Sequence, residues 1–153
     1  IIHNYFKLII KKQLDIEYIL SNKLDYIIDL FEKKGYKNEQ NVMAVSIIKK
    51  SLSALCNSKD GQWIYQVHED DQFELKHIVM LGDDFEIRIP DRTFIHNNTR
   101  WIIDYKVLFG DKDLSIEAKK HLRQLNIYES LFDDKYPVIK AIYFAPQGKL
   151  IRL

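Results

Sequence analysis

The spacing of apolar residues changes along this chain, and the change sets the order of its helices and strands. In the first part, apolar residues recur at intervals of three and four, as on one face of an amphipathic helix. This spacing predicts helices near residues 2–10, 16–31 and 42–55, and we expect Gly35 to end the second helix. Between residues 73 and 107, apolar and polar residues alternate, which is typical of half-buried strands.

The alternating region predicts an antiparallel meander. Its expected strands are residues 73–80, 85–91 and 100–107. A turn at Gly82–Asp84 separates the first two strands, and Asn97-Asn98 predicts a tight hairpin before the third, because asparagine tolerates the positive φ of such turns. A helix over residues 114–132 and a buried strand over 137–144 complete the order.

We therefore expect one α/β domain over residues 1–153. It would have an N-terminal helical part, about 1–57, and a core, about 58–153, whose central mixed sheet is flanked by helices. Its 153 residues, 46% of them hydrophobic, are enough to build a core. The start at Ile1, with neither Met nor a signal pattern, suggests a fragment of a longer protein.

Cysteine content and hydropathy indicate the expected compartment. Cys56 is the only cysteine, so an internal disulfide is excluded, and a reducing, cytoplasmic environment is expected. No apolar run reaches the roughly 18 residues that a membrane span requires, so no membrane partner is expected.

Net charge gives no general argument for a nucleic-acid partner. The 23 Lys and Arg residues nearly balance 22 Asp and Glu residues, so contact with DNA would need a local basic patch. The candidate residues for phosphate contacts are Arg92, Arg100, Lys119, Lys120 and Arg123.

A carboxylate stands where the alternation calls for an inward side chain. Asp91 shares its expected strand face with Ile87 and Ile89, and on the next strand Asp104 and Lys106 share one face. The intervening hairpin can bring the three polar side chains together. Two carboxylates and an ammonium group suit phosphodiester hydrolysis with Mg²⁺ or Mn²⁺, where the lysine orients or deprotonates the attacking water. The alternative is an ordinary solvated strand face with a surface ion pair.

These residues also resemble a known family. Pro90-Asp91, followed after twelve residues by Asp104-Tyr105-Lys106, resembles the nuclease motifs of RecB- and AddA-type helicase-nucleases, and Gln124 with Tyr128 resembles their Q-x-x-x-Y box. The resemblance implies a restriction-endonuclease-like PD-(D/E)xK core. It also implies that the catalytic residues are Asp91, Asp104 and Lys106. The implied metal ligands are His3, Asp91, Asp104 and the backbone carbonyl of Tyr105. DNA-binding or supporting roles are implied for Gln124, Tyr128, Arg92 and Glu74.

The resemblance further implies a function and partners. The chain would be the DNA-cutting module of a helicase-nuclease that processes double-strand breaks, and it is expected to act as an exonuclease. Its partners would be DNA, the helicase part of the same polypeptide and a second subunit. One alternative is a non-catalytic DNA-binding or helicase-bracing module on the same fold. A third is a restriction-type or transposon-associated endonuclease. The other histidines match no zinc-ligand spacing and are expected at the surface: His68, His77, His96 and His121.

Overall fold

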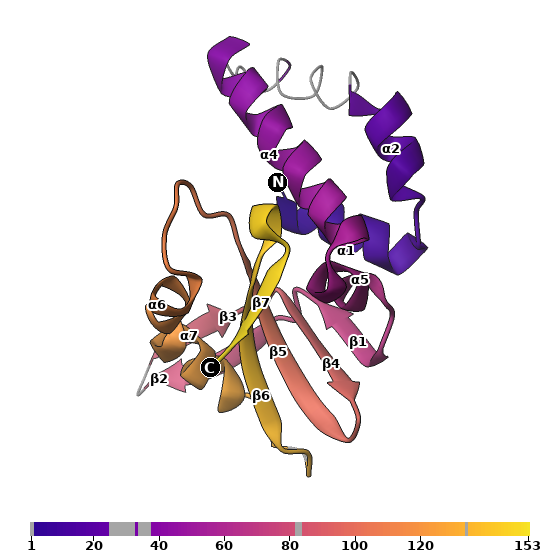
Figure 1. Ribbon diagram of the computed structural model, residues 1–153. Coiled ribbons are helices and arrows are strands. Elements are labelled where there is room, and N and C mark those ends of the chain that lie inside the picture. Colours follow the sequence, from indigo (N-terminus) through magenta and orange to yellow (C-terminus); the bar gives the residue numbers. More distant parts are fainter. Residues whose placement is uncertain (1, 25–32, 34–37, 82–83, 134) are drawn as a thin grey trace. The chain divides into compact units, whose positions relative to one another are not determined.

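The chain divides into two compact units, which we describe separately. The computed structural model describes residues 2–24, 33, 38–81, 84–133 and 135–153. The helical unit comprises residues 1–66 and 145–149, and the sheet unit comprises residues 67–144 and 150–153. The expected mixed α/β class, with a central sheet that contains both parallel and antiparallel pairs, is confirmed (Figure 1).

Four helices and a short 3₁₀ turn are described in the helical unit. They are α1 (Ile2–Lys12), α2 (Ile16–Asn22), α4 (Asn38–Asn57), α5 (Lys59–Tyr65) and η1 (Ala145–Gln147). The apolar positions that predicted α1 and α4 are largely buried, as shown by Phe6, Ile10, Ile48 and Leu52. Packing of these faces supplies most of the stability of such helices. The expected helix end at Gly35 lies outside the described residues.

Helix α5 was not predicted, because its first residues are polar and include a glycine. The hydroxyl of Ser58 accepts a 2.8 Å hydrogen bond from the N–H of Gly61 and so caps the helix. A Cβ atom at Gly61 would lie 2.2 Å from the carbonyl oxygen of Ala54. The glycine is therefore required by the close approach of α5 to α4 and does not mark a loop.

The main sheet has five strands in the order β1-β4-β5-β6-β7. They are β1 (Glu69–Phe73), β4 (Arg92–His96), β5 (Thr99–Lys106), β6 (Val138–Phe144) and β7 (Lys149–Arg152). β4 is antiparallel to both β1 and β5, whereas β5 and β6 are parallel. The buried strand expected at residues 137–144 is confirmed as β6.

A separate hairpin interrupts the expected meander. Strands β2 (His77–Leu81) and β3 (Asp84–Arg88) form a two-stranded sheet and, among the described residues, pair only with each other. The expectation that residues 85–91 form one strand is therefore wrong, because β3 ends at Arg88. Ile87 and Ile89 are 56% and 37% exposed. Gly82 and Asp83 of the expected turn lie outside the described residues.

The tight turn at Asn97-Asn98 is confirmed. Both asparagines have positive φ, 50° and 55°, which fits a two-residue hairpin connection whose twist matches the flanking strands. The turn joins β5 to β4, a strand that the sequence did not predict as separate. Four of its five residues, Arg92–Ile95, are buried, and a strand covered on both faces shows no alternation of polar and apolar residues.

Two short helices cover one face of the sheet. The single helix expected over residues 114–132 is instead α6 (Leu114–Lys119) and α7 (Leu122–Glu129). Sheet residues Ile102, Ile142 and Phe144 pack against helix residues Ala118, Leu125 and Tyr128. Side chains alternate along a strand, so Asp104 and Lys106 project from the same face as Ile102. Within the described ranges, no helix has the length and apolar character needed to cross a membrane.

Candidate active site

Asp91 and Asp104 come together at the open end of the β4–β5 hairpin. Arg92 pairs with Ile103, so the residue before β4 stands opposite Asp104. The main-chain N–H of Tyr105 donates a 2.8 Å hydrogen bond to Oδ2 of Asp91. Asp91 is half-buried and Asp104 is 2% exposed. The hairpin thus brings the two carboxylates to adjacent positions on neighbouring strands.

Lys106 completes the group of three side chains. Its Nζ forms an ion pair with Oδ2 of Asp104 at 2.6 Å. The lysine side chain is 28% exposed, against 3% for that of Asp104. A ligand arriving from solvent would therefore meet the ammonium group more readily than the buried acid. Two acids and one amine leave the group with a net negative charge when all three are ionised.

The protonation of Asp104 reflects this crowding. Burial, followed by the negative charge of Asp91, raises the pKa of Asp104 to about 6, although the nearby ammonium group of Lys106 opposes the rise. A carboxylate that is desolvated beside a second carboxylate holds its proton more tightly. A divalent cation between the two acids would relieve both effects, and such a pKa shift is common at functional sites.

Gln124 and Tyr128 lie on α7, on the same side of the sheet as the acids. Nε2 of Gln124 donates a 2.7 Å hydrogen bond to the hydroxyl of Tyr128, which is 6% exposed. Burial raises the pKa of Tyr128, although the hydrogen bond from Gln124 lowers it. The negative charges of Asp104 and Asp91 raise this pKa further. Tyr128 is therefore both a core residue and an electrostatic neighbour of the carboxylates.

Glu74 follows β1 at the level of the acids. Phe73 pairs with Arg92, and the N–H of Glu74 donates a 3.0 Å hydrogen bond to the carbonyl of Asp91. The backbones of residues 74, 91 and 104 therefore lie next to one another on three adjacent strands. Glu74 itself has a φ of 52°, which ends the strand. Among the residues that the structure describes, no three His, Cys, Asp or Glu side chains are gathered closely enough to hold a metal ion.

The remaining predicted ligands are the Tyr105 carbonyl and His3. In a strand, the N–H and C=O of one residue point to the same neighbour, so the Tyr105 carbonyl points to the side on which its N–H meets Asp91. His3 lies on α1, in the helical unit, and is half-buried. Its role as a metal ligand stays a prediction.

Two of the basic residues expected to contact phosphate are buried instead. Arg92 is 0% exposed and binds Asp71 through two hydrogen bonds of 2.8 and 2.6 Å. Arg100 is 6% exposed and binds Asp70 at 2.8 Å. The expectation of a phosphate contact from these arginines is therefore wrong, because each guanidinium group is committed to a carboxylate.

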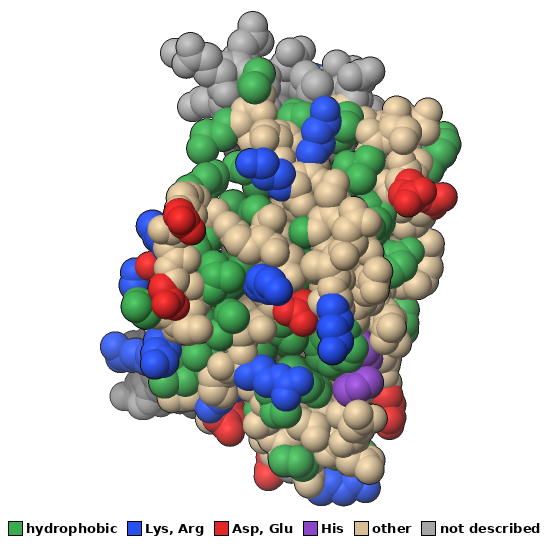
Figure 2. All heavy atoms as spheres, in the orientation of Figure 1, with side chains coloured by type: hydrophobic (Ala, Val, Ile, Leu, Met, Phe, Trp, Pro, Cys, Tyr) green, Lys and Arg blue, Asp and Glu red, His purple; other side chains and the backbone are tan. Residues whose placement is uncertain are grey.

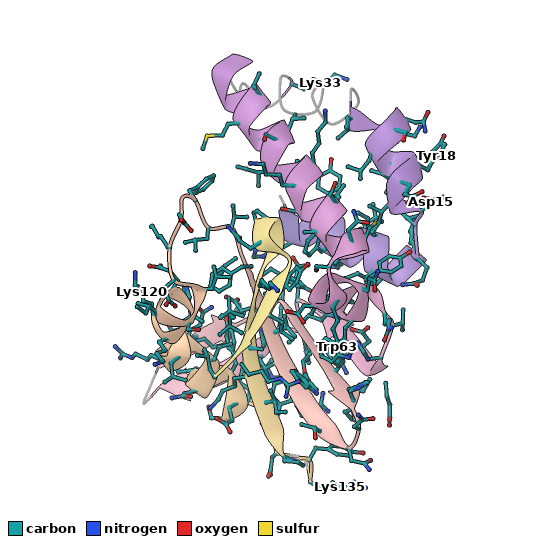
Figure 3. The ribbon with its side chains drawn as sticks, in the orientation of Figure 1. Asp15, Tyr18, Lys33, Trp63, Lys120 and Lys135 are labelled. Atoms are coloured by element: carbon teal, nitrogen blue, oxygen red, sulfur yellow. The ribbon has the colours of Figure 1, made fainter. Side chains whose placement is uncertain are left out.

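The other basic candidates are exposed. Lys119, Lys120 and Arg123 lie at the end of α6 and the start of α7. In Figure 3 the side chain of Lys120 points outward, and its Nζ forms a 2.6 Å ion pair with Glu117. Figure 2 shows basic and acidic side chains interspersed on the face that it displays, which agrees with the small net charge.

The four histidines expected at the surface are half-buried. His68 stacks on Phe94 with ring centroids 4.2 Å apart, and the ring of His77 packs edge-on against Phe132 at 5.2 Å. His121 precedes α7, and burial, followed by the positive charge of Lys106, lowers its pKa. His121 was not predicted to lie near Lys106, although its position three residues before Gln124 is one helical turn away on the same face.

A cavity of about 440 Å³ lies in the helical unit. None of the predicted site residues lines it; the lining residues are Gln13, Asp15, Ile16, Glu17, Leu55, Cys56, Gln62 and Tyr65. Asp15 is occupied as the cap of α2, where its carboxylate accepts a 3.0 Å hydrogen bond from the N–H of Tyr18 (Figure 3). The cavity is thus a feature separate from the carboxylate pair.

Comparison with known proteins identifies no family. No protein-family model matches the sequence. No curated protein is significantly similar to it.

Proposed function

We propose that this chain is a Mg²⁺- or Mn²⁺-dependent deoxyribonuclease of the PD-(D/E)xK class. One observation carries the proposal: Asp91 and Asp104 come together on adjacent strands, with Lys106 2.6 Å from the second acid. The spacing that suggested the motif is thus matched by proximity in space. A solvated strand face would not bury Asp104 to 2% exposure.

The donor atoms fit a hard divalent cation. The carboxylates of Asp91 and Asp104 would hold it, and the Tyr105 carbonyl is a further candidate ligand. Oxygen ligands of this kind are those that Mg²⁺ and Mn²⁺ prefer. A cation between the buried carboxylate of Asp104 and that of Asp91 would offset the negative charge that the ammonium group of Lys106 leaves uncompensated.

The residues of the chain divide the catalytic work. The bound cation would neutralise charge on the phosphate and make water a better nucleophile. Lys106, more exposed than Asp104, would orient the attacking water and accept or share its proton. The N–H of Tyr105 fixes the orientation of the Asp91 carboxylate before substrate arrives. Gln124, held by Tyr128, would contact substrate or support the lysine strand.

The biological setting follows from the motif resemblance alone. The chain would act as the nuclease module of a RecB/AddA-type helicase-nuclease in cytoplasmic double-strand-break repair, as an exonuclease on a strand that the helicase delivers. Its partners would be DNA, the helicase part of the polypeptide and a second subunit.

The first test is metal binding, which does not require the helicase. Calorimetry with Mn²⁺ should show a site in the wild-type chain that disappears in Asp91→Ala. DNA degradation should require Mg²⁺ or Mn²⁺, stop in excess chelator, and be abolished by Asp104→Ala and by Lys106→Ala while the circular dichroism spectrum is unchanged. Degradation that persists in chelator would contradict the metal mechanism.

The same titration tests the non-catalytic alternative. A wild-type chain that binds no metal but retains DNA would be a DNA-binding or helicase-bracing module. In that case Asp91→Ala would leave DNA affinity unchanged or slightly increased, because it removes a negative charge.

A further inference from the structure

We propose that Arg92 is a positioning residue that holds the two aspartates in register from the opposite face of the sheet. It is the first residue of β4 and is paired on both sides, opposite Phe73 of β1 and Ile103 of β5. Asp91 is the next residue toward the N-terminus. Whatever fixes Arg92 therefore fixes the point from which the Asp91 carboxylate projects.

The surroundings of Arg92 immobilise it. The side chain is 0% exposed, and its guanidinium group lies between the rings of Phe73 and Phe94, 4.8 Å from each ring centroid. Nε and one terminal nitrogen bind the two oxygens of Asp71, at 2.8 and 2.6 Å. A planar two-point pair restricts orientation as well as distance.

The same guanidinium group reaches the strand that carries the second aspartate. Arg92 and Tyr105 interact electrostatically through their side chains, and Tyr105 is 1% exposed. Tyr105 stands between Asp104 and Lys106, and its N–H holds Asp91. The side chain of Arg92 thus links β1, β4 and β5 on one face, directly behind the acids on the other.

The shape of β1 supports this role. The register between β1 and β4 shifts by one residue at a β-bulge between Glu69 and Gln72. Asp70, within this bulge, has a φ of 49°. The extra residue lets two successive acids reach two arginines, Asp70 to Arg100 and Asp71 to Arg92. A buried ion pair adds little stability over apolar residues of the same size, so its best-supported benefit is a unique register.

The two arginine pairs provide a matched experiment. The double variant Asp71→Leu/Arg92→Met removes both buried charges, and Asp70→Leu/Arg100→Met is the control. Arg100 lies four residues, or about 13 Å along the strand, from Asp104. Both double variants avoid the unpaired buried charge that could unfold a single variant.

The readouts separate positioning from general stability. Hydrogen exchange of the Tyr105 amide reports its bond to Asp91 without any metal, and it should be at least about tenfold faster in the Arg92 double variant than in the control. Mn²⁺ affinity should fall by about 10- to 100-fold in the Arg92 double variant alone, which is the usual effect of removing a residue that orients a ligand. Arg92→Lys, which keeps the charge but loses the two-point contact, should fall between this variant and wild type.

The metal readout rests on the proposed function, and the exchange readout does not. Wild-type protein that binds no Mn²⁺ would overturn the proposed function, while fast Tyr105 exchange in the Arg92 double variant would still support positioning. The positioning role is refuted if the Tyr105 amide exchanges at the same rate in the Arg92 double variant and in the control. If the double variant does not fold, equal exchange rates in Arg92→Lys and wild type refute it instead.

Discussion

The N–H of Tyr105 donates to the carboxylate of Asp91, so the residue between Asp104 and Lys106 also orients the acid on the neighbouring strand. This hydrogen bond joins the two halves of the motif through the backbone. A substitution at residue 105 that preserves burial would leave it intact, whereas a substitution at Asp91 removes its acceptor.

Asp104→Asn should stabilise the metal-free protein at pH 7.5. The folded-state pKa of Asp104, about 6, is above its ordinary value, so ionising Asp104 in the folded protein costs free energy. The free energy of unfolding therefore falls as the pH rises from about 4 to about 6. The neutral amide avoids this cost, which is about 3 kcal/mol for a shift of this size. Urea unfolding in chelator between pH 4 and 8 measures the effect, and equal pH dependence in variant and wild type would contradict it.

Asp70→Asn is the control of opposite sign. Although burial opposes the shift, the hydrogen bond from Arg100 leaves the pKa of Asp70 below its ordinary value. The carboxylate therefore stabilises the fold above its ordinary pKa, and this contribution falls as pH falls through the depressed folded value. Asp70→Asn should lower the free energy of unfolding at pH 7.5.

Metal affinity should weaken in acid. Below pH about 6, a proton competes with the cation for Asp104, and affinity should fall about tenfold for each pH unit, down to the ordinary carboxylate pKa. Calorimetry in buffers of different ionisation enthalpy would detect the proton released on Mn²⁺ binding at pH 5.5. Binding without proton release at that pH would place the metal elsewhere.

Lys106→Met should separate catalysis from metal binding. We expect the rate of DNA cleavage to fall by at least about 100-fold, because a proton-transfer or water-orienting group is removed. Mn²⁺ affinity should not fall, since the substitution removes a positive charge 2.6 Å from Asp104. Lys140→Met on β6 is the control, because that lysine is bound to Asn126 and Glu129. A comparable loss in both variants would indicate a structural effect.

The exposed basic residues of α6 and α7 should determine the salt dependence of DNA binding. If Lys119 and Arg123 each bind one phosphate, Lys119→Gln and Arg123→Gln should each reduce the slope of log affinity against log salt by about 0.9 on duplex DNA. Lys135→Gln, an exposed lysine in the loop before β6, should leave the slope unchanged (Figure 3). If all three variants behave alike, these residues do not form the DNA surface.

Local chemistry made the hairpin predictable. Asn97-Asn98 can adopt the positive φ values of a tight turn, and the period of two placed Asp104 and Lys106 on one face. Those features were enough to predict that the two acids and the lysine would meet. Helices α1 and α4 were predictable because their apolar faces are buried at helical spacing.

Features set by tertiary packing could not be predicted in this way. Strand β4 carries Arg92 and Thr93 at buried positions, and only the pairing with Asp71 explains a charged residue there. The same pairing removed Arg92 from the set of phosphate-binding candidates. The β2–β3 hairpin displaced Asp91 from the strand that the alternation suggested, because pairing partners are not encoded in the period of a strand.

The short Asn97-Asn98 connection also bears on how the protein folds. Only twelve residues separate Asp91 from Asp104, so closing this segment costs little chain entropy, whereas the parallel pairing of Asp104 with Ile142 must close a much longer loop. Hairpins of this size form within microseconds. We therefore expect the acids to meet early, on a nascent chain whose last strands have yet to be synthesised.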